Sequence, residues 1–201
     1  MDAALGGELT PWEQRDRLGV LRGLYRTLKG IAFSPGTFFD RLRPETPWRD
    51  AFWYGWLLQA LFGAVGVLLY VVPLLSRYGG ALPSPAQLGG YLIVPLAPIV
   101  LYPAIVLALA GLVHTLALVT RGTHRGIGAT LRAICYSGVA LGLLVSLGPL
   151  GLWALFVGVY ALARFQQTTL SRAAFALVGA ELLLGAAVVV PLAILLARHL
   201  P

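Results

Sequence analysis

The stretch AAFALVGAELLLGAAVVVPLAILLA, residues 173–197, decides the fold of this chain. Apart from Glu181 it carries no charge, and a helix of this length, rising 1.5 Å per residue, crosses the roughly 30 Å hydrocarbon core of a bilayer. Of all residues in the chain, 58% are hydrophobic and 11% are charged, which is too apolar for a water-soluble domain of this size. The sequence therefore predicts an all-α, polytopic integral membrane protein.

The same length criterion divides the rest of the chain. Long apolar runs occupy residues 51–75 and 91–119, and two shorter runs occupy 133–147 and 149–163 around a Gly148-Pro149-Leu150-Gly151 turn signal. With residues 173–197 these runs predict about five transmembrane helices. The third and fourth are short, and they form a hairpin that either crosses a thinned bilayer or re-enters from one side.

Basic residues set the predicted orientation, because short cytoplasmic loops carry an excess of Lys and Arg. Arg77 and Arg198 fall on one side of the predicted spans. The other thirteen fall on the opposite side: Arg15, Arg17, Arg22, Arg26, Lys29, Arg41, Arg43, Arg49, Arg121, Arg125, Arg132, Arg164 and Arg172. We therefore expect a cytoplasmic N-terminus and a C-terminus across the membrane. Removing the hairpin from the count leaves this orientation unchanged.

Residues 1–50 differ from the rest and form a predicted cytoplasmic segment. Periodicity predicts an amphipathic helix over about 12–32, then a short helix over about 35–43 opened by Ser34-Pro35. On the first helix a basic face falls within about 60° at 100° per residue, opposite an apolar face. This pattern fits a helix lying on anionic lipid headgroups, and equally a helix packed on the cytoplasmic ends of the spans. The basic face consists of Arg15, Arg22, Arg26 and Lys29.

Glu181 is the candidate polar site within the membrane. An ionisable residue inside a span is costly and normally faces a bundle interior or a wet cavity. We expect its partner to be His114 or Arg132, both placed toward the cytoplasmic side, or a hydroxyl such as that of Tyr136. Three interpretations stay open: a neutral carboxyl hydrogen-bonded within the bundle, a proton- or ion-coupling group, and a contact to a polar ligand.

Other chemistry receives little support. We find no phosphate-binding glycine loop, no nucleophile–base arrangement and no paired intramembrane carboxylates, so the sequence predicts no catalytic residues and no cofactor. His114 and Glu181 alone are too few ligands for a metal site. The net charge of +7 is explained by orientation and by the basic helix, so no nucleic-acid partner is expected. Expected partners are the lipid bilayer with its anionic headgroups, and a protein partner or a second copy of the chain.

Several short motifs resemble the Yip family, the Ypt/Rab-interacting membrane proteins, in its prokaryotic form. Residues 34–42 read Ser-Pro-Gly-Thr-Phe-Phe-Asp-Arg-Leu, similar to the family's P-x-x-x-F-x-x-L entry segment. The resemblance covers roughly residues 33–197 and implies five spans and a cytoplasmic N-terminus. The further matching positions, in the family's order, are His114, the glycine-rich 122–128 connection, Thr130-Leu131-Arg132-Ala133, Tyr136, Pro149-Leu150-Gly151, Trp153 and Ser171-Arg172-Ala173.

The chain also departs from the family. It has no Asp-Leu-Tyr-Gly-Pro segment, and Ser137-Gly138-Val139 stands where a proline often follows the tyrosine of the third span. Small-GTPase binding is therefore not carried over. We expect a membrane scaffold, adaptor or membrane-shaping protein, in a prokaryotic inner membrane. The alternatives are a small transporter or channel coupled through Glu181, and a lipid-handling protein.

Overall fold

A computed structural model describes residues 7–43, 46–77, 84–138 and 149–199. Within these ranges all regular secondary structure is helical. The β-type pairing there is limited to one isolated parallel bridge between Glu8 and Leu42. The predicted all-α class is therefore confirmed. The helices are α1 (Arg15–Leu18), α2 (Val20–Phe33), α3 (Pro35–Arg41), α4 (Trp48–Arg77), α5 (Pro85–Val119), α6 (Ile127–Ser137), α8 (Pro149–Gln166) and α9 (Leu170–His199).

Three segments of the described chain are helical, long and apolar enough to cross a membrane. They are Trp48–Leu69 in α4, Ile99–Val119 in α5 and Leu170–Ala187 in α9, and α8 contributes a shorter apolar helix over Gly151–Gln166. The predicted span over 133–147 lies largely outside the described residues. Its first part, 133–137, belongs to α6, which begins at Ile127. Five crossings thus stay a prediction, whereas three membrane-length helices are observed.

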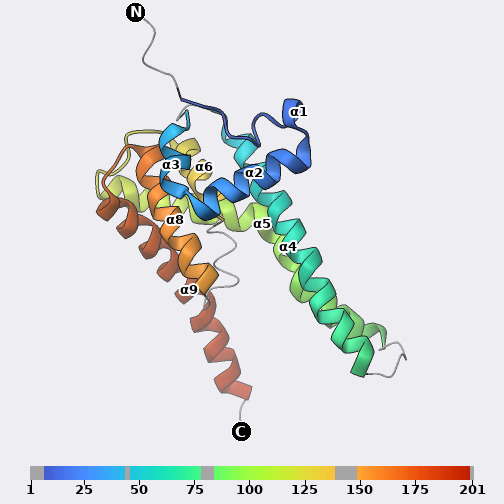
Figure 1. Ribbon diagram of the computed structural model, residues 1–201. Coiled ribbons are helices and arrows are strands. Elements are labelled where there is room, and N and C mark those ends of the chain that lie inside the picture. The colour runs from blue at the N-terminus through green and yellow to red at the C-terminus, as the bar shows by residue number, and fades with distance from the viewer. Residues whose placement is uncertain (1–6, 44–45, 78–83, 139–148, 200–201) are drawn as a thin grey trace, which may run out of the picture.

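The helices diverge from one end of the molecule (Figure 1). There α1, α2 and α3 lie beside the start of α4, the start of α6 and the end of α8. From this end α4 and the adjoining part of α5 run away together as one arm, while α9 forms another. The end of α9 therefore lies far from the N-terminal helices, and we call residues 7–43, which cover the shared end, the cap.

A close approach of α4, α5 and α6 anchors the bundle beneath the cap. Gly55 on α4 is buried, and a Cβ atom there would collide with the Tyr102 hydroxyl of α5 and come within 3.1 Å of the Cys135 carbonyl oxygen of α6. Only glycine leaves room for this three-helix contact, which is how small residues let membrane helices pack closely.

The prediction of one continuous helix over about 12–32 is wrong in one respect, because two helices, α1 and α2, occupy this range. Gly19 has φ 81°, a left-handed conformation that glycine adopts without a Cβ penalty, and it separates α1 from α2. The buried face of α2 consists of Gly23, Leu24, Thr27 and Ile31. A helical wheel drawn through the break therefore misplaces Arg15, which precedes it.

Candidate functional site

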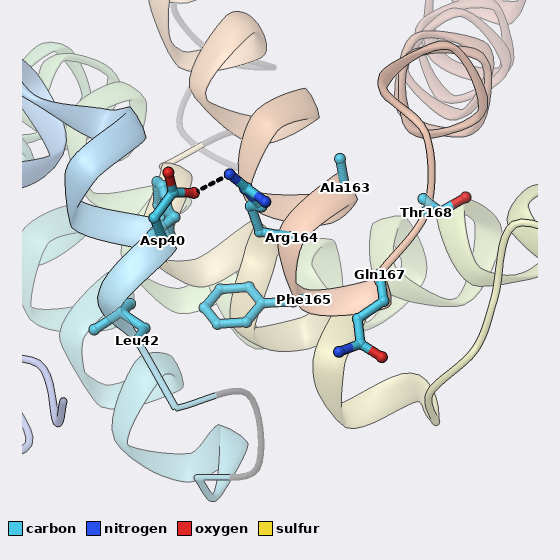
Figure 2. Close-up of a pocket in the computed structure, with 8 residues that line it drawn as sticks. Asp40, Leu42, Ala163, Arg164, Phe165, Gln167 and Thr168 are labelled. Atoms are coloured by element: carbon cyan, nitrogen blue, oxygen red, sulfur yellow. Dashed lines mark ion pairs between the residues drawn. The ribbon is translucent and has the colours of Figure 1, made fainter. Parts of the chain in front are cut away.

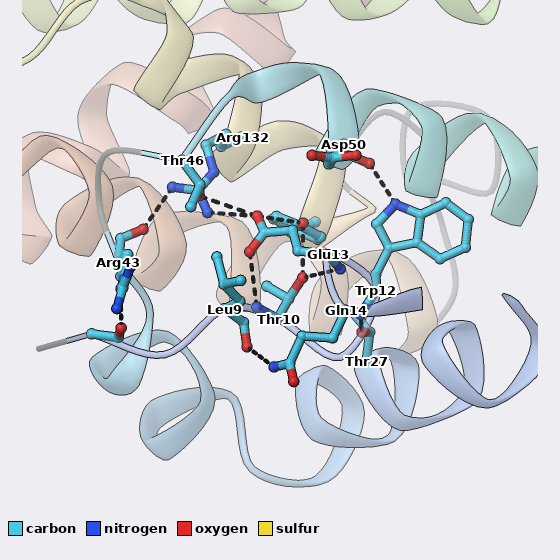
Figure 3. A network of polar contacts seen from close by, with 12 residues as sticks. Leu9, Thr10, Trp12, Glu13, Gln14, Thr27, Arg43, Thr46, Asp50 and Arg132 are labelled. Atoms are coloured by element: carbon cyan, nitrogen blue, oxygen red, sulfur yellow. Dashed lines mark hydrogen bonds and ion pairs between the residues drawn. The ribbon is translucent and has the colours of Figure 1, made fainter. Parts of the chain in front are cut away.

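A capping box orders the chain just before α1. The Thr10 hydroxyl accepts a hydrogen bond from the Glu13 backbone N–H (3.0 Å), and the Thr10 backbone N–H donates to Glu13 Oε2 (2.8 Å). Pro11 occupies the first position of the turn, where a missing N–H costs nothing. This reciprocal pair fixes the Glu13 side chain, which points into the molecule beneath the cap (Figure 3).

The second Glu13 oxygen is the centre of a buried polar network. Oε1 accepts from Arg132 Nη2 (3.0 Å), from the Tyr136 hydroxyl (3.0 Å) and from the Thr46 hydroxyl (3.1 Å). The exposed fraction of the Arg132 side chain is 1% and that of Glu13 is 3%. Arg132 and Tyr136 stand one turn apart on α6, so one helix face supplies both donors. The cap and α6 are therefore joined by a desolvated ion pair.

Arg132 is held on several sides. Its Nη1 donates to the Arg43 carbonyl oxygen (2.8 Å), and its guanidinium lies 4.6 Å from the centroid of the Phe165 ring on α8. Guanidinium groups stack well on aromatic faces, and this contact contributes on the order of 1–2 kcal/mol when desolvated. Phe165 in turn meets Phe39 of α3 edge to face at 5.8 Å. One arginine thus connects the cap to both α6 and α8.

Tyr136 both donates and accepts a hydrogen bond in this network. Its hydroxyl donates to Glu13, and the Thr10 hydroxyl at 3.1 Å donates to the Tyr136 oxygen. The hydrogen bonds close a ring in which Thr10 also accepts from the Glu13 N–H.

Trp12 attaches the cap to the start of α4. It is 4% exposed, its indole N–H donates to the Asp50 carbonyl oxygen (2.7 Å), and its backbone N–H donates to the Thr27 hydroxyl of α2 (2.9 Å). Arg15 pairs with the Asp50 carboxylate at 2.7 Å and lies over the Trp12 ring. Arg15, predicted to belong to the membrane-facing basic surface, is instead used within the protein.

A second, more exposed contact joins the cap to α8. Arg164 Nη2 lies 2.5 Å from Asp40 Oδ1, and the Tyr160 hydroxyl donates to the same oxygen at 2.9 Å. Figure 2 shows this pair at the edge of a pocket of about 510 Å³ between α3 and the turn after α8. Because both charged side chains are about half exposed, water screens their attraction, and the pair contributes little stability.

The predicted site residues are only partly brought together. Arg132 and Tyr136 meet, but around Glu13 and not around Glu181, so the expected partnership is corrected. His114 Nδ1 lies 3.1 Å from the Thr130 hydroxyl. Glu181 is partly buried on α9, and its carboxylate makes no hydrogen bond or ion pair with any other residue in the described part of the chain. Its proposed functional role stays a prediction.

Sequence reasoning missed Glu13. The signal was present, because Thr10-Pro11-Trp12-Glu13 matches the capping-box pattern with proline at the first helical position. The remaining basic residues of the predicted face, Arg22, Arg26 and Lys29, are exposed on α2. Among the residues described, no three His, Cys, Asp or Glu side chains gather in a way that suits a metal ion.

These features define a class: an all-helical chain with membrane-length helices, closed at one end by its own N-terminal segment through a buried ion pair. Comparison with protein-family models, with curated proteins and with solved structures gives no match.

Proposed function

We propose that this protein is an integral membrane scaffold or adaptor that presents α2 to the surface of the bilayer. The observation that carries the proposal is the fixed orientation of α2. Gly23, Leu24, Thr27 and Ile31 face the protein, so the exposed side of the helix, opposite these residues, is available to other partners. The Trp12–Thr27 hydrogen bond and the Glu13–Arg132 pair hold that orientation.

The free surface of α2 has two adjacent stripes. Leu21 and Tyr25, 80% and 62% exposed, form an apolar stripe. Arg22, Arg26 and Lys29, the basic stripe, follow it around the helix at 100° per residue. A helix with an apolar stripe beside a basic one sits in the headgroup region, with the apolar side chains toward the acyl chains and the cations beside lipid phosphates.

The proposed topology places the cap in the cytoplasm and the end of α9 across the membrane, with five crossings that include the short hairpin. Basic residues support it, because ion pairs join Arg132 and Arg164 to Glu13 and Asp40 of the cap. Such clustering is what the positive-inside rule describes. The Yip-family resemblance suggests the same topology, and with it a prokaryotic inner membrane.

The scaffold proposal is tested by reconstitution into vesicles containing anionic phosphatidylglycerol. We expect the wild-type protein to remodel these vesicles, seen as a change of size or shape by electron microscopy. The double variant Leu21→Ser/Tyr25→Ser is expected to lose the effect with its melting temperature preserved, since neither side chain is buried in the protein. Remodelling that survives this variant at wild-type strength contradicts the proposal.

A matched charge test uses Arg22→Gln/Arg26→Gln/Lys29→Gln. Each of these charges near an anionic surface contributes about 1 kcal/mol of attraction. We therefore expect remodelling to weaken in vesicles with phosphatidylglycerol and to change little in vesicles of zwitterionic lipid alone. Equal effects in both lipids would exclude the proposed electrostatic contact.

A further inference from the structure

We propose that a cavity beside the cap, lined by Arg125, Arg132 and His124, binds a phosphate group. The cavity has a volume of about 620 Å³ and lies between residues 46–48, at the start of α4, and the turn that opens α6. Its described lining contains two guanidinium groups and one imidazole and no carboxylate. It is thus chemically suited to an anion.

Two of the residues that line the cavity each carry a buried N–H group that lacks an acceptor among the described residues: Arg125 Nη1 and Arg132 Nε. A buried donor on a charged group without a partner costs more free energy than a neutral one. Glu13 neutralises Arg132 from the cap side, whereas Arg125 forms no ion pair with any of the residues that the structure describes. The flat, forked guanidinium matches phosphate oxygens in a way that a lysine ammonium does not.

The turn that carries Arg125 is built rigidly. The Gln166 side chain is fully buried; its Oε1 accepts from the Arg125 backbone N–H (3.0 Å) and its Nε2 donates to the Gly126 carbonyl oxygen (3.3 Å). The same Nε2 donates to the Thr130 hydroxyl at 2.9 Å. A buried amide side chain therefore fixes the turn against α6, independently of any ligand.

The N-terminal end of α6 adds a positive electrostatic potential that favours an anion in the cavity. Gly126 precedes the first helical residue, and no side chain caps this end. Both Gly126 and Gly128 line the cavity, and a Cβ at Gly126 would meet no other atom within 4 Å. The absent side chains leave the positive end of the helix open to an anion, as in known phosphate sites.

The phosphate has two possible sources, a phospholipid headgroup or a water-soluble phosphate compound. Trp48, which also lines the cavity, begins the first candidate span and is 37% exposed. Tryptophan at such a position marks the headgroup level of a membrane. Either source would place the same phosphate oxygens against Arg125.

The test uses the purified full chain in a neutral maltoside detergent, titrated with inorganic phosphate and followed by calorimetry. In parallel, native mass spectrometry counts the phospholipid molecules that stay bound to the chain. Arg125→Gln keeps the backbone N–H that bonds Gln166 and removes the fork, and it is expected to weaken phosphate binding at least about tenfold or to abolish retention of a phospholipid. Arg121→Gln is the matched control, because Arg121 is exposed in the same loop and does not line the cavity. It should bind as the wild type does.

Arg125→Lys, which keeps the charge, should lose part of the affinity, and all variants should melt at the wild-type temperature. Binding of free phosphate without retained lipid identifies a soluble ligand, and retention of a phospholipid that depends on Arg125 identifies a headgroup. The Arg22→Gln/Arg26→Gln/Lys29→Gln variant should bind phosphate as the wild type does. The phosphate site is therefore tested separately from the proposed role of α2. Equal binding by wild type, Arg125→Gln and Arg121→Gln, or binding by none of them, would overturn it.

Discussion

Two glutamates of this chain lie in contrasting surroundings. Glu13 belongs to a charge-rich segment, yet its side chain is 3% exposed and its carboxylate receives hydrogen bonds from α6 and from the chain before α4. Glu181 belongs to an apolar helix, yet its carboxylate is partly exposed and makes no hydrogen bond or ion pair with the rest of the described chain. The organised polar chemistry therefore lies under the cap, and the isolated carboxylate lies on α9.

The contrast teaches that the most unusual residue in a sequence is not necessarily the one that makes the most polar contacts in the fold. A charge in an apolar run is conspicuous because its surroundings are uniform. Glu13 is inconspicuous because seven other charged residues lie in the stretch from Glu8 to Lys29. Its burial depends on Arg132, more than a hundred residues away, which no local pattern reveals.

The largest effect is expected for Glu13→Ala. Removing one partner of a buried ion pair leaves the other charge desolvated, which costs about 3–5 kcal/mol. We expect the free energy of unfolding in detergent to fall by about this amount. Glu8→Ala is the matched control, since Glu8 is exposed and pairs with Leu42 through its backbone alone. If Glu13→Ala lowers the free energy of unfolding no more than Glu8→Ala does, the Glu13–Arg132 pair does not stabilise the cap, and the contrast with Glu181 fails.

A smaller loss of stability is expected for Thr10→Ala. The variant removes the capping hydroxyl, which also contacts Tyr136, while Glu13 keeps its bond to Arg132. Loss of a cap of this kind costs about 0.5–2 kcal/mol. Thermal unfolding should show a decrease well below that of Glu13→Ala, and Thr10→Ser should restore most of it. An unchanged melting temperature would mean that the capping box does not position Glu13.

Asp40→Asn is expected to have a smaller effect still. The Asp40–Arg164 pair is about half exposed, and such pairs contribute about 0–1 kcal/mol. The difference from wild type should shrink further in high salt, because salt screens exposed charges. A loss comparable to that of Glu13→Ala would show that the exposed contact, and not the buried one, holds the cap.

Glu181→Gln is expected to change stability least, because no described hydrogen bond or ion pair of the carboxylate is lost. The same variant tests the transport alternative. If the wild-type protein carries a proton-dependent flux in proteoliposomes and Glu181→Gln abolishes it with the fold intact, the scaffold proposal is replaced by coupled transport. Equal flux for the two proteins leaves Glu181 without that role.

The sequence predicted the helical class and the positions of the long helices well, because hydropathy over twenty residues is a strong signal. Runs at 51–75, 91–119 and 173–197 lie within α4, α5 and α9. The N-terminal segment was predicted less well. Its 3.6-residue pattern continues through Gly19, whose positive φ interrupts the helix and changes the phase of the wheel.

The candidate site was predicted only in fragments. Arg132 and Tyr136 were predicted as partners of Glu181, and their spacing places them on one face of α6. The partner was wrong, since depth in a span suggested Glu181 whereas the folded cap supplies Glu13. Gln166 was not predicted at all, because an uncharged side chain at the end of an apolar helix carries no distinctive pattern.

Hydrogen exchange followed by mass spectrometry tests the central claim most directly, with wild type, Glu13→Ala and Glu181→Gln compared in the same detergent. If the Glu13–Arg132 pair holds the cap, peptides from residues 7–43 should lose protection in Glu13→Ala, while α9 keeps its own. Glu181→Gln should leave the cap as protected as in the wild type. Unchanged protection of the cap in Glu13→Ala, or an equal loss in both variants, would contradict the account.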